Sequence, residues 1–364
     1  MGSFPGKPIS QPVDYYPRPM PAARKLPTGK VPSDVLRRVV FPYLGAKSDR
    51  VLQGPGVGED AAVIDMGDRV IIAKANPITG AEAKIGWLAV HINANDVATC
   101  GARPQWFLSI VLLPEGADES LLEGIMKDIH EACSELGISL IGGHTESTPG
   151  LDKPIIAGFM MGELSKDEFI TTGGARPGDL VVMTKGAGIE GTGILATDLS
   201  DKLLPEVGWE VLDRAAELLK KISVVQEALT AVDVGGVHSL HTPTEGGVMN
   251  GIWEIAEAAN AGVVIEESAI PQADETRVIC KALGVDPLRL LASGALLIVV
   301  DPDKAGELVS VLGESGVVAS VVGEIRQLED GRLLVTSDGG RIPIEAVAQD
   351  ELYRILDEYG SKDQ

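Results

Sequence analysis

The stretch "GPGVGEDAAVIDMGDRVIIAKANPITG", Gly54 to Gly80, carries the pattern on which the fold assignment depends. Three glycines open it, and their backbone N–H groups can approach an anion closely because no side chain shields them. These glycines are Gly54, Gly56 and Gly58. Two adjacent acids, Glu59 and Asp60, come next, and an apolar strand follows the acids. This order indicates an anion or metal site at the mouth of a buried strand. It is not a Walker loop, since no GK[ST] sequence follows a glycine loop.

Size and composition favour a mixed α/β protein of about two domains. The chain has 364 residues, of which 45% are hydrophobic and only 4% aromatic, so its cores are built mainly from Val, Ile, Leu and Ala. The formal net charge of −22 argues against nucleic acid and anionic membranes as partners, because a basic stripe that would contact phosphates is missing. An acidic chain that binds a polyphosphate usually recruits a divalent cation to do so.

The three cysteines, Cys100, Cys133 and Cys280, are widely spaced and odd in number. Their spacing is typical of neither a disulfide framework nor a metal site, so we expect a reducing, cytoplasmic location. The sequence shows no unbroken apolar segment of membrane-spanning length and no opening signal-peptide pattern.

The composition divides the chain into an arm and two domains. Residues 1–32 contain eight prolines without an apolar period, and we interpret them as an extended arm, draped on the body or on a partner, or disordered. Residues 33–168 show a βαβ succession, and residues 169–364 show a second one. In the first domain we expect helices over 33–44, 83–104 and 119–136, strands over 61–66, 69–75, 106–114, 138–141 and 154–164, and a loop over 142–147.

The second domain is predicted to begin with a strand and a flexible glycine loop, Thr184 to Gly193, which is a candidate lid. The remaining predicted elements are helices over 210–229, 247–261 and 344–359 and strands over 262–266, 295–300 and 317–325.

The helix after Gly80 places a carboxylate on an apolar stripe. Its apolar residues recur at helical spacing, and the next position on that face is Asp96, beside Asn95. A buried carboxylate is costly unless it is paired or bound to metal. The Asp96 carboxylate is therefore either hydrogen-bonded to backbone at the helix end or a metal ligand. The acids Glu59 and Asp60 strengthen the second interpretation, because Mg²⁺ prefers hard oxygen ligands.

Two further segments are candidate anion contacts. "GGHTES" begins with Gly142 and Gly143, and it is either a tight connection with a solvated histidine or places His144, Thr145 and Glu146 beside the metal. "TPTEGG" opens a predicted amphipathic helix, either as an ordinary N-cap or as an anion site. Its candidate residues are Thr244, Gly246 and Gly247.

Taken together, the motifs "GVGEDAAVI", "NANDVATCGARP", "GGHTE" and "TPTEGGVMNGIWEIA" resemble those of the aminoimidazole ribonucleotide (AIR) synthetase-like superfamily. This superfamily includes thiamine-monophosphate kinase, selenophosphate synthetase and the hydrogenase-maturation dehydratase, and the resemblance covers roughly residues 33–345. It implies a two-domain fold with a dimerising N-terminal α/β domain and a C-terminal α/β sandwich. It also implies ATP and Mg²⁺ as cofactors, with the family's acidic motifs falling on Glu59–Asp60 and Asn95–Asp96.

The resemblance is nearest to the hydrogenase-maturation branch, with three departures. Around "TPTEGG", His241 and Glu245 stand where an acid and an arginine would be expected. That branch modifies a cysteine at its own C-terminus, whereas this sequence ends "SKDQ", so we expect no such reaction on its own tail. Asn76 stands where the family commonly has an aspartate that helps to bind metal. Alternatively, Asn76 only starts a turn into Pro77.

The resulting hypothesis is an ATP-dependent enzyme that transfers a phosphoryl group to an amide-type or small-molecule acceptor. Asp60 and Asp96 are expected to bind Mg²⁺ with help from Glu59, and Asp96 and His144 are the candidate catalytic residues. The expected partners are nucleotide, a small-molecule or protein acceptor, and a second copy of the chain. Two alternatives stay open: a thiamine-monophosphate-kinase-like enzyme and a catalytically reduced nucleotide-binding scaffold.

Overall fold

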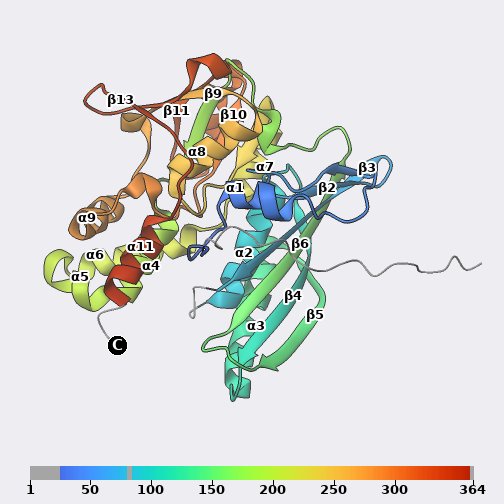
Figure 1. The fold of residues 1–364 in the computed structure, drawn as a ribbon, viewed down its shortest axis with the longest axis vertical. Helices are drawn as coiled ribbons and strands as arrows, with labels where there is room; N and C mark the ends of the chain where they lie inside the picture. Colours follow the sequence, from blue (N-terminus) through green and yellow to red (C-terminus); the bar gives the residue numbers. More distant parts are fainter. Residues whose placement is uncertain (1–24, 80–83, 361–364) are drawn as a thin grey trace, which may run out of the picture.

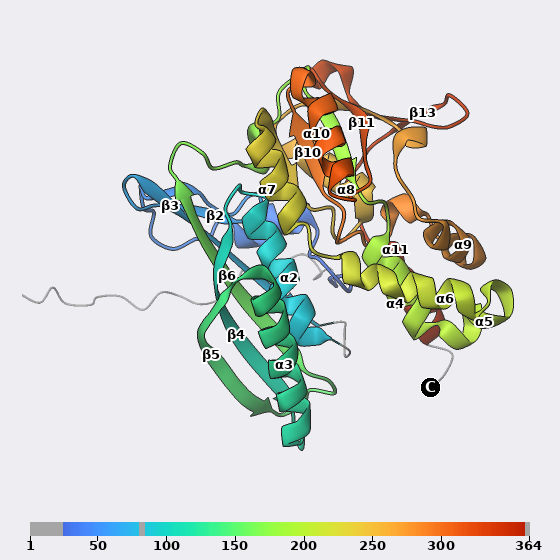
Figure 2. The same ribbon diagram turned by 180° about the vertical axis from the view of Figure 1, so that it is seen from behind.

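The computed structural model of the chain describes residues 25–79 and 84–360. Within them the chain forms two β-sheets, each covered by helices, which confirms the predicted mixed α/β class. Figures 1 and 2 show the sheets as two bodies that meet near α2 and α7. The first sheet lies within residues 51–165 and the second within residues 180–343.

The first sheet has six strands, of which only the β4–β5 pair is parallel. Helices α2 (Ile85–Ala98) and α3 (Glu119–Leu136) cover one of its faces (Figure 2). The strand order is β1 (Val51–Gln53), β2 (Ala62–Asp65), β3 (Arg69–Ile78), β6 (Ile155–Ser165), β4 (Pro104–Pro114) and β5 (Ser139–Thr148).

Local chemistry explains why α3 matches its predicted range. Asp118 caps its start by accepting a hydrogen bond from the Leu121 N–H at 3.0 Å, and Gly137 ends it in the left-handed conformation at φ +69°. Its apolar stripe, including Ile125 and Ile129, is buried against α2 and the sheet.

The predicted loop over residues 142–147 is wrong, because these residues continue strand β5 alongside β4. Gly143 makes this pairing possible: a Cβ there would lie 1.9 Å from the Ser109 carbonyl oxygen. The glycines that suggested a turn therefore serve a close approach between two strands. The predicted helix over 33–44 is also shorter, since only α1 (Ser33–Val35) and the π-turn η1 (Leu36–Val40) form.

The second sheet has seven strands, of which only the β9–β12 pair is parallel. Helices α7 (Val225–Val234) and α10 (Pro302–Glu314) pack on one face, and α8 (Gly247–Ala258) packs on the other. The strand order is β13 (Arg341–Pro343), β12 (Arg332–Val335), β9 (Gly262–Glu266), β11 (Ala319–Arg326), β7 (Leu180–Thr184), β10 (Leu297–Val300) and β8 (Val237–His241).

Five more helices form a separate apolar cluster beside the second sheet (Figure 1). They are α4 (Ile189–Asp198), α5 (Ser200–Val207), α6 (Trp209–Ala216), α9 (Asp274–Leu283) and α11 (Glu351–Gly360). The predicted glycine lid over 184–193 is therefore wrong in its second half, because Ile189 to Gly193 begin α4 and are buried. The predicted helix over 210–229 is interrupted by the 3-10 turn η3 (Glu217–Lys221), and the last helix begins only at Glu351.

The face of the first sheet opposite α2 and α3 is apolar and only partly covered. Along β4 and β6 it presents half-buried side chains around Phe159, whose side chain is exposed. Among the described residues, none of the helices has the length and apolar character needed to cross a membrane.

Candidate functional site

Two of the predicted acids meet at a buried site between the two sheets. Asp60 lies two residues before β2, Asp96 lies in α2, and both are buried. The second sheet contributes His241 at the end of β8, and α8 contributes Glu254. We call the carboxylates of Asp60, Asp96 and Glu254 and the cations of Lys30, Lys74 and His241 the acid cluster.

His241 joins the two halves of the chain at the centre of the acid cluster. Its Nδ1 lies 3.0 Å from Asp60 Oδ1, and its Nε2 lies 2.9 Å from Glu254 Oε2. Burial alone lowers the pKa of His241, but the charge and hydrogen bond of Asp60 and those of Glu254 raise it to about 10. Because ionised carboxylates only accept hydrogen bonds, both ring nitrogens donate and the ring is an imidazolium.

Asp96 is held by three side chains. Its Oδ2 lies 2.9 Å from Lys74 Nζ and accepts a hydrogen bond from Asn76 Nδ2 at 2.8 Å. Its Oδ1 accepts a hydrogen bond from Thr242 Oγ1 at 3.2 Å. Burial alone lowers the pKa of Lys74, but the charges of Asp96 and Asp60 raise it above the ordinary value. Asn76 thus faces the predicted site, and Asn93 fixes it by accepting from its backbone N–H at 2.8 Å.

The segment just before α1 reaches the same site. Lys30 Nζ lies 2.8 Å from Glu254 Oε1, and the Lys30 backbone N–H donates to Glu245. Burial alone raises the pKa of Glu254, but the charge of Lys30 and the contacts with His241 lower it to about 2. The end of the proline-rich segment therefore lies on the second half of the chain.

Glu59 points elsewhere, although it is adjacent to Asp60. Its Oε2 accepts a hydrogen bond from the Thr172 backbone N–H at 3.2 Å. Burial raises its pKa, which backbone hydrogen bonds only partly offset. Of the two neighbouring acids, Glu59 therefore contacts the backbone of Thr172, whereas Asp60 contacts His241.

The residues present do not fit a resident Mg²⁺. Mg²⁺ requires oxygen ligands in near-octahedral geometry, whereas both Asp96 oxygens are engaged by protein donors and both Asp60 oxygens face His241. In the described ranges 25–79 and 84–360, no three His, Cys, Asp or Glu side chains are grouped to hold a metal ion.

The glycine loop before Asp60 packs against α8. Gly58 has φ +83°, and a Cβ there would lie 2.8 Å from the Glu254 carbonyl oxygen. Its missing side chain allows this close approach between the two halves. Gly54 and Gly56 precede it in the same loop, where a Cβ on Gly56 would lie 3.1 Å from Glu59 Cγ.

The predicted anion site at the start of α8 is occupied by the chain itself. The Gly246 N–H donates to Asp350 Oδ2 at 2.5 Å, and Asp350 Oδ1 accepts from the backbone of Leu291 and Leu352. Burial raises the pKa of Asp350 to about 6. Gly247 has φ +63°, and a Cβ there would lie 2.6 Å from the Leu290 carbonyl oxygen. Thr244 lies in the same turn, and its backbone carbonyl accepts a hydrogen bond from the Gly247 N–H at 3.0 Å.

Asn95 connects the two halves through backbone. Its Nδ2 donates to the Ile222 carbonyl at 2.8 Å, and its Oδ1 accepts from the Val224 N–H at 2.8 Å. The side-chain amide is therefore engaged with the chain between η3 and α7. Cys100, which follows α2, is buried, and burial raises the pKa of its thiol well above the ordinary value, so it is not an activated nucleophile.

Within one chain the structure does not bring "GGHTES" to the acid cluster. Gly142, Gly143, His144 and Thr145 lie on β5, which is separated from β3 by β6 and β4. Three strand spacings of about 4.8 Å place β5 about 14 Å from β3. His144 is exposed and its Nε2 lies 3.1 Å from Glu146 Oε2.

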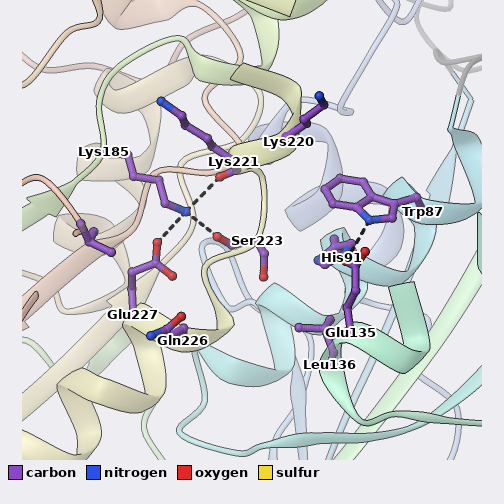
Figure 3. Close-up of a pocket in the computed structure, with 11 residues that line it drawn as sticks. Trp87, His91, Glu135, Leu136, Lys185, Lys220, Lys221, Ser223, Gln226 and Glu227 are labelled. Atoms are coloured by element: carbon purple, nitrogen blue, oxygen red, sulfur yellow. Dashed lines mark hydrogen bonds and ion pairs between the residues drawn. The ribbon is translucent and has the colours of Figure 1, made fainter. Parts of the chain in front are cut away.

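A pocket of about 370 Å³ lies elsewhere between the halves, where α2 and α3 face η3 and α7 (Figure 3). Trp87 stacks on His91 and donates to Glu135 at 3.2 Å, while across the pocket Lys185 lies 2.5 Å from Glu227. In the part of the chain that the structure describes, the lining includes none of the predicted site residues.

Several site residues were not predicted: Lys30, Lys74, His241, Glu254 and Asp350. For Lys74 the sequence does contain a signal. Along β3, Val70 and Ile72 are buried, and the alternation of a strand places Lys74 and Asn76 on the same inward side. A lysine on the inward side of a strand is expected to pair with a carboxylate.

The two halves match two family models, "AIR synthase related protein, N-terminal domain" over residues 58–164 and "AIR synthase related protein, C-terminal domain" over residues 176–336. The chain belongs to the AIR synthase-related family, which confirms the predicted superfamily and two-domain fold.

Its relatives include hydrogenase-maturation proteins. The chain is 28% identical over 323 residues to a putative hydrogenase expression/formation protein of Methanocaldococcus jannaschii, covering 86% of this chain and 93% of that protein. It is 30% identical over 312 residues to carbamoyl dehydratase HypE of Cupriavidus necator, covering 82% and 86%. The structure of hydrogenase maturation protein HypE in complex with ATP matches with a TM-score of 0.67 and 25% identity, covering 87% of this chain and 93% of that one.

Proposed function

We propose that this protein is an ATP-using enzyme of the hydrogenase-maturation type that transfers a phosphoryl group to an amide-type or small-molecule acceptor. The observation that carries the proposal is the likeness to HypE along most of both chains, including a HypE that binds ATP. The acids predicted from the family motifs, Asp60 and Asp96, also lie at one buried site between the halves.

The chemistry suits a carbamoyl group. Converting a primary amide to a nitrile removes its oxygen, which is a poor leaving group. Transfer of the γ-phosphoryl group of ATP to that oxygen releases ADP, and subsequent departure of phosphate with loss of both N–H protons leaves the nitrile. Catalysis of such a transfer depends mostly on positioning and on stabilising charge.

This chain supplies cations for that purpose. Lys74 and Lys30 carry ammonium groups in the acid cluster, and Thr242 offers a hydroxyl beside Asp96. The prediction that Mg²⁺ accompanies the nucleotide stays a prediction, and the paired carboxylates do not favour a resident ion.

Calorimetry with ATP tests the proposal. Asp96→Asn should weaken ATP binding by about 1–3 kcal/mol, because it removes the charge that orients Lys74. The matched control is Asp65→Asn, which removes a carboxylate paired with Lys166 at 2.7 Å away from the acid cluster and should leave ATP binding unchanged. A wild-type protein that binds no ATP would reject the proposal.

Turnover identifies the acceptor. ATP consumption should be followed with a panel of carbamoyl compounds, purine intermediates and thiamine monophosphate. Stimulation by thiamine monophosphate would favour the kinase alternative, which the "GVGEDAA" form of the loop supports.

A catalytically reduced nucleotide-binding scaffold is the second candidate. Two observations favour it: the acid cluster is internally paired, and the start of α8 is already met by Asp350. ATP binding without turnover on the whole panel would support this candidate.

Assembly and location are also proposals. We propose a homodimer through the open apolar face of the first sheet around Phe159. Cys100, Cys133 and Cys280 are free and buried, which is consistent with the proposed cytoplasmic location.

A further inference from the structure

The acid cluster contains as many cations as carboxylates. Asp96 faces Lys74, and Asp60, His241, Glu254 and Lys30 form a continuous chain of ion pairs with distances of 2.8–3.0 Å. A divalent ion between Asp60 and Asp96 would have to displace the Lys74 ammonium or sit beside it against like-charge repulsion.

We propose that Lys74, His241 and Lys30 are the resident cations of this site, so that the site binds the phosphates of ATP directly and without a divalent metal ion. Lys74 is the principal phosphate contact, because it is the less exposed of the two lysines, 22% against 48%, and its ammonium lies 2.9 Å from Asp96. The binding of ATP rests on the proposed function, whereas the exclusion of metal does not.

The side chains retain the access that this role needs. The Lys74 side chain is 22% exposed and the Lys30 side chain 48% exposed, although the carboxylates that they face are nearly buried. A lysine ammonium has three N–H donors, so Lys74 can stay paired with Asp96 and contact a phosphate at the same time. His241 is buried between two acids, which hold its ring in place. It therefore keeps Asp60 and Glu254 neutralised while a phosphate binds.

A purely structural role for Lys74 gives a different result. If Lys74 only fastens Asp96, its replacement changes stability but not the metal requirement of ATP binding. Lys74→Met keeps the length of the stem and removes the charge, whereas Lys74→Arg keeps the charge. Lys166→Met is the matched control, since Lys166 also pairs with a carboxylate of the first sheet, Asp65.

The first measurement uses Mn²⁺ alone, followed by electron paramagnetic resonance. The wild-type protein should not bind Mn²⁺ at this site, and Lys74→Met should gain a site that is lost again in Lys74→Met/Asp96→Asn. Wild-type Mn²⁺ binding that disappears in Asp96→Asn would overturn the inference, whether or not ATP binds.

The second measurement is the dissociation constant of ATP with excess EDTA and with saturating Mg²⁺. In the wild type the two values should agree within about threefold. Lys74→Met should weaken binding in EDTA about 10–100-fold, the scale of a lost charge-assisted contact, and Mg²⁺ should restore part of it. Lys74→Arg should stay near the wild type, and Lys166→Met should match it.

The outcomes separate the two claims. ATP binding that requires Mg²⁺ in the wild type overturns the resident-cation assignment and leaves the proposed function standing. Absence of ATP binding in both buffers rejects the proposed function and the phosphate role of Lys74, and the Mn²⁺ result then decides the exclusion of metal. Unchanged melting temperatures of Lys74→Arg and Lys166→Met would show that the comparison is made on folded protein.

Discussion

His241 and His144 make the same kind of contact in different surroundings. Each places a ring nitrogen about 3 Å from a carboxylate, 2.9 Å for His241 and Glu254 and 3.1 Å for His144 and Glu146. The His241 side chain is 3% exposed and links the two halves, whereas the His144 side chain is 65% exposed on the edge strand β5. The family motif drew attention to His144, although the buried His241 is the histidine that contacts a predicted acid, Asp60.

Because the two contact distances are alike, we expect burial to separate the energies of these two pairs. An exposed pair contributes little because water screens it and side-chain entropy opposes it. Breaking a buried pair leaves the remaining charge without solvent or partner, which is expensive. Mutations at the two histidines therefore give the most direct test of the comparison.

His241→Ala should have the largest effect. It leaves Asp60 and Glu254 facing each other as buried carboxylates, and the free energy of unfolding should fall by about 3–5 kcal/mol in denaturant titration. His144→Ala is the matched change at the exposed pair and should cost at most about 1 kcal/mol. Equal losses at the two positions would refute the difference that burial is argued to make.

Glu190 is a buried carboxylate without a cationic partner among the groups that shift its pKa, and it extends the comparison of buried and exposed charges. Burial raises the pKa of Glu190 to about 7, and Ser293 donates a hydrogen bond while the nearby charges of Asp350 and Glu245 are negative. A raised native-state pKa means that this group stabilises the fold fully below about pH 4.5 and that the contribution disappears as the pH rises through 7.

Glu190→Gln should remove that pH dependence. The unfolding free energy of the wild type minus that of the variant should fall by about 2–3 kcal/mol between pH 4.5 and pH 7.5. Glu217→Gln, at an exposed residue of η3, is the control and should give a constant difference. A constant difference for Glu190→Gln as well would show that Glu190 is ionised throughout.

The sequence predicted those parts of the fold that depend on local pattern. Helix α3 has a cap, an apolar stripe and a terminal glycine, and its predicted and observed ranges agree. The loop prediction over 142–147 failed because glycines signal both a turn and a close approach of strands, and only tertiary pairing with Ser109 distinguishes them.

The candidate site was predictable only on its first side. Asp60 and Asp96 follow from a motif and from helical periodicity, which are local. His241 contacts Asp60 from a position 181 residues later and in turn contacts Glu254, and no local pattern predicts these contacts. Lys74 was detectable from strand alternation, but only by asking what a lysine does among inward-facing residues.

Dimer formation bears on the comparison of the two histidines, because it would decide whether His144 stays exposed to solvent. The open face of the first sheet around Phe159 is the proposed dimer interface, and a second copy is what would change the surroundings of β5. Light scattering at micromolar concentration should report a dimer. Phe159→Glu should weaken it about 10–100-fold, since a charge would be buried in an apolar contact. A wild-type monomer would remove the proposal. Lys127→Glu, on the exposed side of α3, is the control and should remain dimeric.

Asn76→Asp should have the smallest effect and tests the acid cluster where family resemblance and structure disagree most. The Asn76 amide donates to Asp96 Oδ2, so an aspartate replaces a donor with a second acceptor beside the same oxygen. Because Lys74 already neutralises Asp96, the added charge alone should not create a Mn²⁺ site and should cost about 1 kcal/mol of stability. Combined with Lys74→Met, the same substitution should raise Mn²⁺ affinity well beyond that of Lys74→Met alone, since the acid cluster then holds four carboxylates and has lost the Lys74 charge. If Asn76 only starts the turn into Pro77, both backgrounds should bind Mn²⁺ as they did before the substitution. That result, in variants that melt like their parents, would reject Asn76 as a position of this site.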